Sequence, residues 1–127
     1  MPGTPSGRSP ALLVVEDDHL LRWSLREKFQ GAGWEVLEAD SGKSGLSAAS
    51  GRPVDLALLA GLLPDVDGAT LAAQISFAHP ECHVVLMGGA GRGEAAAPSS
   101  GGWPTLEKPF DLDDLVRWAA GTALLTG

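Results

Sequence analysis

Five short apolar runs recur along the chain, separated by polar or glycine-rich sequence. They cover residues 11–15, 35–39, 55–60, 83–87 and 104–107. Their spacing is too long for β-hairpins and is typical of a strand, a crossover helix and the next strand. Three of the runs are continuously aliphatic, as expected of strands that are covered on both faces. The pattern predicts a five-stranded parallel sheet with helices on both sides.

The segments between these runs show helical spacing. Leu21, Leu25 and Phe29 are four residues apart, Asp18 precedes them as an N-cap, and Gly31 follows as a stop signal. We expect further helices at about residues 43–50, from the Asp67-Gly68 turn to Pro80, and from Asp111 onward. The inward faces of the last two helices are predicted to carry Leu71, Ile75, Ala78, Leu112, Leu115, Val116 and Ala119.

The sequence between the fourth and fifth apolar runs, GGAGRGEAAAPSSGGW, disfavours a helix. Glycines and a proline leave only residues 94–97 as helix formers. We therefore expect the fourth helix of the fold to be shortened or missing. Residues 1–10 are rich in Pro, Gly, Ser and Thr and are predicted to form a flexible leader. The domain is expected to cover residues 11–122, followed by a tail at 123–127.

Length and charge narrow the range of functions. At 127 residues the chain can form one domain with a conventional core. Nine Lys and Arg against sixteen Asp and Glu leave a formal charge of −7, which opposes direct binding to nucleic acid or to an anionic membrane. A single cysteine, the absence of an apolar run of ~20 residues and the absence of a secretory signal favour a cytoplasmic location.

Charged side chains follow the predicted strands at their carboxyl ends. Glu16 and Asp17 come after the first strand, and Lys108 follows the fifth. In an open parallel sheet the active crevice lies at this edge, so these side chains are expected to face one another. Carboxylates suit a divalent cation, and an ammonium group suits a phosphoryl oxygen. The alternative is that the acids only cap the following helix and interact with its dipole.

Three blocks of the sequence resemble the receiver domains of bacterial response regulators. They are LLVVEDDHLLRWSLREKFQGAGWEVLEADSGKSGL, VDLALLAGLLPDVDG and LEKPFDLDDL, in that order over about residues 11–120. LLRWSLRE further resembles receivers attached to NtrC-like, sigma-54-dependent transcriptional activators. The resemblance implies a flavodoxin-like, doubly wound α/β domain with strand order 2-1-3-4-5. It also implies a role in two-component signalling, in which a receiver accepts a phosphoryl group from a sensor kinase.

Part of the family's site is retained. The resemblance places Glu16 and Asp17 at the acidic pair after the first strand, with Asp17 as the direct magnesium ligand. It places Lys108 at the lysine that contacts the phosphoryl group, and it implies a cis peptide bond between Lys108 and Pro109.

Three relay positions depart from the family's pattern. Ala60 stands at the position of the phosphoacceptor aspartate, Gly88 at that of the Ser or Thr after the fourth strand, and Thr105 at that of the switching Tyr or Phe. An acyl phosphate needs a carboxylate nucleophile, so a methyl group cannot accept the phosphoryl group. The nearby Asp65 and Asp67 are interpreted as turn-forming and helix-capping residues.

The alanine also changes the expected electrostatics. With Ala60 in place, Asp17 is the single direct ligand left, so magnesium is expected to bind weakly or not at all, and no other cofactor is expected. Removing one of three clustered carboxylates relieves like-charge repulsion. We therefore expect Lys108 to pair with Asp17 and to hold the domain in one metal-independent state.

Two tryptophans are predicted to form a partner surface. Trp23 and Trp118 lie off the inward stripes of their helices, and exposed indoles are typical of protein contacts. The expected partner is another protein or an output domain, with a homodimer as an alternative.

Together these features predict a degenerate receiver domain without enzymatic activity. It would act as a phosphorylation-independent interaction module, belonging to a transcriptional regulator. Two alternatives remain: a standard phosphorelay receiver whose acceptor aspartate was replaced by alanine in the laboratory, and a small enzyme that reuses the acidic pocket.

Overall fold

Five parallel strands and four helices make up the part of the fold that the structure describes. The computed structural model describes residues 9–89 and 103–126. The strands are β1 (Ala11–Val15), β2 (Glu35–Ala39), β3 (Leu56–Ala60), β4 (His83–Gly89) and β5 (Thr105–Lys108). The helices are α1 (His19–Gly31), α2 (Gly42–Ala49), α3 (Gly68–Ala78) and α4 (Leu112–Thr126).

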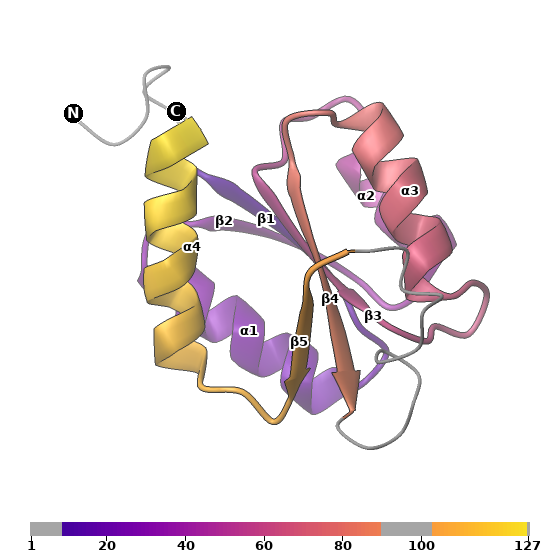
Figure 1. The fold of residues 1–127 in the computed structure, drawn as a ribbon, viewed down its shortest axis with the longest axis horizontal. Coiled ribbons are helices and arrows are strands. Elements are labelled where there is room, and N and C mark those ends of the chain that lie inside the picture. Colours follow the sequence, from indigo (N-terminus) through magenta and orange to yellow (C-terminus); the bar gives the residue numbers. More distant parts are fainter. Residues whose placement is uncertain (1–8, 90–102, 127) are drawn as a thin grey trace.

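The strands form one sheet in the order β2-β1-β3-β4-β5. Figure 1 shows the sheet between two layers of helices, with α1 and α4 on one face and α2 and α3 on the other. The predicted doubly wound, flavodoxin-like α/β fold is therefore confirmed. The prediction of a shortened or missing fourth helix falls on residues 90–102, which lie outside the described residues.

Side-chain alternation along the strands divides the core into two clusters. Leu13 and Val15 of β1 pack on the side of α2 and α3, whereas Leu12 and Val14 pack on the side of α1 and α4. All four side chains are fully buried, and each contributes about 1.5–3 kcal/mol of hydrophobic stabilisation. Because both faces of the central strands are buried, their sequences are continuous aliphatic runs.

Aspartate side chains cap the first turns of α1, α3 and α4, as predicted. The Asp18 carboxylate accepts hydrogen bonds from the backbone N–H groups of Leu20 and Leu21 at the start of α1. Asp67 accepts from the Thr70 N–H at 2.7 Å, and Asp111 accepts from the Asp114 N–H at 3.0 Å. These bonds satisfy backbone donors that have no partner within the helix.

Two helix details differ from the expectations. Ala78 is exposed, because it is the last residue of α3 and follows the turns in which Leu71, Ala72 and Ile75 pack on the sheet. α4 continues to Thr126, so most of the segment expected to be a tail is helical. None of the described helices is long and apolar enough to cross a membrane.

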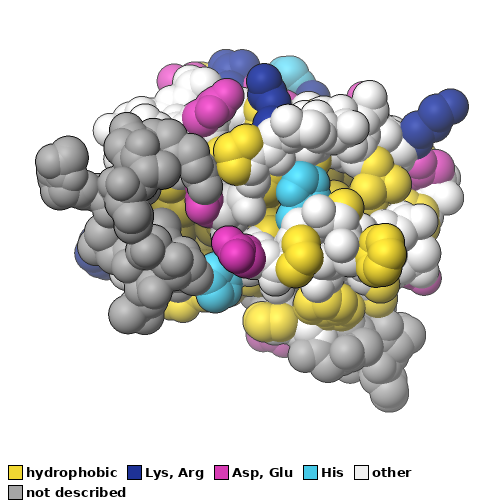
Figure 2. Space-filling view, turned by 90° about the horizontal axis from the view of Figure 1, so that it is seen from above, with side chains coloured by type: hydrophobic (Ala, Val, Ile, Leu, Met, Phe, Trp, Pro, Cys, Tyr) yellow, Lys and Arg dark blue, Asp and Glu magenta, His cyan; other side chains and the backbone are white. Residues whose placement is uncertain are grey.

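The two ends of the sheet differ in character. Figure 2 looks onto the end at which the strands begin, where hydrophobic side chains gather on the side of α3 and Lys and Arg side chains lie at the periphery. The charged residues that the sequence singled out, Glu16, Asp17 and Lys108, follow the opposite ends of β1 and β5. We call this opposite end the carboxyl edge.

Candidate functional site

The strand register brings three of the predicted site residues to the carboxyl edge. Val15 of β1 pairs with Leu59 of β3, so the residues that follow them, Glu16 and Ala60, lie at the same level. Lys108 is the last residue of β5, where it pairs with Gly89 of β4. The topology therefore collects side chains that are far apart in the sequence.

Glu16 is the most constrained residue at this edge. Its side chain is 2% exposed, and it is the one charged residue in the described part of the chain that is fully buried. One carboxylate oxygen, Oε1, accepts a hydrogen bond from Lys108 Nζ at 3.0 Å. The other, Oε2, accepts from the Asp18 N–H at 3.0 Å. Both carboxylate oxygens are thus engaged, as a buried charge requires.

The predicted pairing of Lys108 with Asp17 is wrong, because Lys108 pairs with Glu16. Strand alternation explains the choice. Glu16 follows Val14 on the face of α1 and α4, and Lys108 follows Leu106 on that same face. Asp17 comes one residue later and its side chain is exposed, so it does not share the buried position of Glu16.

The backbone of Glu16 is fixed as firmly as its side chain. Its N–H donates to the Ala39 carbonyl of β2 at 3.0 Å. Its carbonyl accepts from Arg22 Nη1 at 2.6 Å, and Arg22 Nε lies 3.4 Å from Glu38 Oε1. Arg22 therefore ties α1 to the ends of β1 and β2. The sequence analysis missed this role because an arginine on an exposed helix face carries no local signal of a buried partner.

The side chains present fit a magnesium ion poorly. Glu16 has both oxygens occupied by internal donors, and Ala60 offers no oxygen. That leaves the exposed carboxylate of Asp17 as the direct ligand on offer. Across the described residues, no group of three or more His, Cys, Asp or Glu side chains is placed to hold a metal ion. Magnesium prefers near-octahedral oxygen coordination, and these side chains do not offer enough oxygen ligands for it.

Ala60 lies in a crowded position at the end of β3. Its side chain is 2% exposed. The next residue, Gly61, donates its N–H to the Met87 carbonyl at 2.8 Å and accepts from the Gly68 N–H at 2.8 Å. A Cβ atom on Gly68 would lie only 2.4 Å from the Ala60 carbonyl oxygen. The start of α3 thus packs against the strand end through a position that only glycine fits.

Asp65 is a helix-capping residue, as interpreted from the sequence, but the helix that it caps is α2 and not the helix that follows it. Its Oδ1 accepts from the Gly42 N–H at 2.8 Å, and its Oδ2 accepts from the Lys43 N–H at 2.9 Å. These two backbone hydrogen bonds lower the pKa of the Asp65 carboxyl. The residue therefore caps α2 from the β3–α3 loop. Asp67 caps α3 as predicted, and its bonds to Thr70 lower the pKa of the Asp67 carboxyl.

Three further predicted positions are located by the structure. The Lys108–Pro109 peptide bond is cis, as the resemblance implied. Gly88 is buried near the end of β4, beside Glu107 of β5. Thr105 begins β5, and its hydroxyl donates to the Trp103 carbonyl at 3.1 Å.

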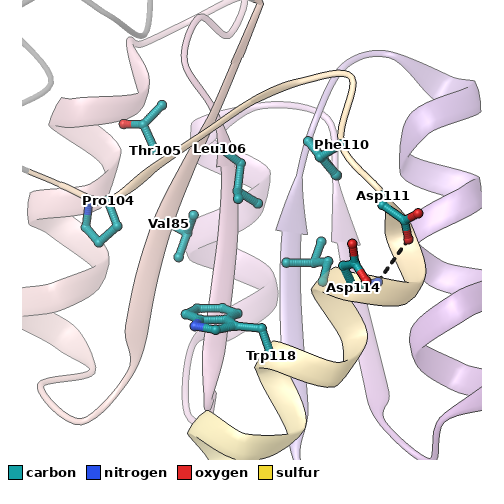
Figure 3. Close-up of a pocket in the computed structure, with 9 residues that line it drawn as sticks. Val85, Pro104, Thr105, Leu106, Phe110, Asp111, Asp114 and Trp118 are labelled. Atoms are coloured by element: carbon teal, nitrogen blue, oxygen red, sulfur yellow. Dashed lines mark hydrogen bonds between the residues drawn. The ribbon is translucent and has the colours of Figure 1, made fainter.

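The two tryptophans predicted to form a partner surface are both exposed. Trp23 on α1 is 45% exposed and Trp118 on α4 is 46% exposed. Trp118 belongs to a groove of about 480 Å³ between β5 and α4. Figure 3 shows Val85, Leu106 and Trp118 around this space, with Asp111 and Asp114 where α4 begins. Sequence reasoning identified Trp118 from helical spacing but gave no sign of the groove around it.

Comparisons with known proteins agree with this geometry. Residues 12–120 match the protein family described as the response regulator receiver domain. The chain is 34% identical over 105 residues to the DNA-binding transcriptional regulator NtrC of Klebsiella pneumoniae, an alignment that covers 81% of this chain and 22% of NtrC. It is 30% identical over 110 residues to the response regulator receiver protein CpdR of Brucella abortus, covering 84% of this chain and 90% of CpdR.

A solved structure extends the comparison. NtrX from Brucella abortus, crystallised with ADP, superposes with a TM-score of 0.81 at 30% identity, over 93% of this chain and 28% of NtrX. The NtrC proteins are also much longer than this chain, which spans about a fifth of their length.

Proposed function

This chain belongs to the response regulator receiver family of two-component systems, and from that premise we propose that it is a degenerate receiver that works without phosphorylation. In this proposal it acts as a protein-interaction module of a transcriptional regulator and has no catalytic activity of its own. Its similarity to NtrC supports the assignment to transcription.

The observation that carries the proposal is Ala60 at the end of β3. It stands where the family resemblance places the phosphoacceptor aspartate. An acyl phosphate forms when a carboxylate oxygen attacks phosphorus, and a methyl group has no such oxygen. Asp65 and Asp67 do not replace it in this proposal, because their carboxylates already cap α2 and α3.

The ion pair at the carboxyl edge supports the same conclusion. The Lys108 ammonium, which the resemblance assigns to a phosphoryl oxygen, contacts the buried Glu16 carboxylate instead. The pair neutralises the buried charge without a metal ion, so we propose that magnesium binds weakly or not at all and that no other cofactor is needed.

The proposed partner is another protein or an output domain, which would be contacted through Trp23 and Trp118. A homodimer is the alternative partner. The formal charge of −7 argues against direct contact with nucleic acid or an anionic membrane, and we place the domain in the cytoplasm.

Incubation with acetyl phosphate and magnesium chloride tests the proposal, with intact mass and reagent consumption as readouts. We expect neither a phosphoryl adduct on the protein nor loss of the reagent. Ala60→Asp serves as the matched variant that regains a carboxylate at this position. An adduct on the unaltered chain would overturn the proposal, and steady consumption of the reagent would indicate a small phosphatase.

A further inference from the structure

Helix α3 carries no charged side chain along its whole length. Its eleven residues include no Asp, Glu, Lys or Arg, whereas each of the other described helices carries at least one such residue. A helix on the surface of a domain normally presents charged side chains to the solvent. The uncharged surface of α3 is therefore typical of a helix that another molecule covers.

The outward face of α3 combines one large side chain with small ones. Thr70, Ala73, Gln74 and Phe77 are exposed and lie opposite the residues that pack on the sheet. Phe77 is 89% exposed, more than any other large hydrophobic side chain in the described part of the chain. Further hydrophobic side chains gather on the same side of the molecule (Figure 2). The face thus has an aromatic ring near the end of the helix and a shallow surface before it.

The charge of the chain indicates which molecule fits this face. Two copies with a formal charge of −7 repel each other wherever their carboxylates come together. Along α3 two copies can meet without placing like charges in contact. The nearest carboxylates in the sequence, Asp67 and Glu81, lie beyond the two ends of the helix, and Asp67 is already bound to the Thr70 N–H.

The face is also complementary to itself. Thr70 precedes Ala73 by three residues and Phe77 follows it by four. About a twofold axis beside Ala73 and Gln74, two antiparallel copies of α3 place Phe77 of each copy against Thr70 of the other. Side chains on a helix lean toward its N-terminus, so the aromatic ring extends over the small Ala73 of the second copy. The large side chain of each copy then fills the shallow surface of the other.

From these features we infer that α3 is a homodimer contact, in which Phe77 of each copy packs over Thr70 and Ala73 of the other. The contact uses neither Trp23 nor Trp118, so it adds a second surface to the proposed function and does not depend on it. No group at the carboxyl edge takes part, so the dimer forms without phosphorylation. One helix pair buries less than the roughly 1,200 Å² of a stable interface, so the dimer is weak and reversible.

Sedimentation velocity of the full chain between 20 µM and 1 mM measures the association. We expect the average mass to rise above that of the monomer with a Kd below about 1 mM. Amide chemical shifts that change on dilution should be concentrated on the outward face of α3. Raising sodium chloride from 50 to 500 mM should strengthen the dimer, because salt screens the repulsion between two acidic copies while the contact itself contains no ion pair.

Two alanine variants test the role of the aromatic ring. Phe77→Ala should weaken the dimer about tenfold or more and leave the melting temperature of the monomer unchanged, because the ring is almost fully exposed. Trp118→Ala is the matched control, since it removes another exposed aromatic side chain on a different helix. It should change the Kd less than about twofold.

Cysteine cross-linking tests the arrangement of the two helices. Ala73→Cys places a thiol next to its own counterpart, so mild oxidation should give a disulfide-linked dimer. In Thr70→Cys the two thiols are displaced by about 10 Å along the helices, so this variant should stay unlinked. The unaltered chain is the blank, because its Cys82 is buried.

These outcomes decide the inference. A chain that stays monomeric at 1 mM, an unchanged Kd in Phe77→Ala, a dimer that salt weakens, or equal cross-linking of the two cysteine variants would each overturn it. The measurements contain no phosphoryl donor and no metal ion, so their failure would leave the proposal of a non-phosphorylated receiver standing.

Discussion

Lys108 and Glu16 are 92 residues apart in the sequence, yet Lys108 Nζ lies 3.0 Å from Glu16 Oε1. Glu16 is buried, and Lys108 is about one-third exposed. The pair joins the ends of β1 and β5 across the intervening strands. It gives the carboxyl edge an internal counterion where metal and phosphoryl chemistry would otherwise be expected.

Removing the lysine should destabilise the fold. Lys108→Met leaves Glu16 as a buried charge with one partner fewer, and we expect a loss of about 2 kcal/mol or more in the free energy of unfolding. Urea unfolding monitored by circular dichroism measures it. Lys28→Met is the control, because the Lys28–Asp113 pair is largely exposed and should contribute little. Equal effects of the two substitutions would show that burial of Glu16 does not matter.

The contact between α3 and β3 can be tested with a single methyl group. In Gly68→Ala the new Cβ would lie 2.4 Å from the Ala60 carbonyl oxygen, so α3 must shift, at a cost of about 1–3 kcal/mol. Gly31→Ala, at the end of α1, meets nothing within 4 Å and should be neutral or slightly stabilising. Thermal unfolding of the two variants compares them. A neutral Gly68→Ala would contradict the close packing of this strand end.

The Asp65 cap predicts a pH-dependent effect. Asp65→Asn loses the charge that accepts two backbone hydrogen bonds, so its melting temperature at pH 7 should be lower than that of the unaltered chain. The pKa of Asp65 is lowered by folding, so the stabilisation is present above the unfolded-state pKa of about 3.9 and is lost as the pH falls through the lower folded value. The difference should therefore shrink in acid.

A control distinguishes this cap from a general charge effect. Asp17→Asn also removes one exposed carboxylate but does not contact the α2 backbone. If both variants follow the same pH profile from pH 7 to pH 3, the specific cap on α2 is not responsible.

Cys82 should be chemically inert in the native state. Burial, together with the negative charge of Asp55, raises the pKa of its thiol from 9.0 to about 12. At pH 8 the reactive thiolate fraction is then about a thousandfold smaller than in the unfolded chain. Alkylation by iodoacetamide, followed by mass spectrometry with and without urea, measures the ratio. Rapid alkylation without urea would show that the residue is accessible.

Local signals made most of the fold predictable. The strands follow from aliphatic runs, and α1 follows from Asp18 and the four-residue spacing up to Phe29. The exposure of Trp23 and Trp118 followed from helical periodicity alone. Each of these features depends on residues within a few positions of one another.

The candidate site was harder to predict because its contacts are long-range. Local spacing does not distinguish Glu16 from Asp17 as the partner of Lys108, since the choice depends on which face of the sheet each strand presents. Asp65 caps a helix 22 or 23 residues earlier in the chain, and the groove beside Trp118 forms from three separate elements. Such contacts depend on how distant elements pack against one another, and local sequence patterns do not indicate this packing.

Thermal unfolding of the unaltered chain and of Ala60→Asp, each in EDTA and in magnesium chloride, tests the central claim most directly. The unaltered chain should melt at the same temperature in both solutions, because Lys108 already neutralises the buried Glu16 carboxylate without a metal ion. Ala60→Asp adds a carboxylate beside Glu16, so it should melt lower in EDTA and recover with magnesium. A rise in the melting temperature of the unaltered chain with magnesium, equal to that of the variant, would contradict the account.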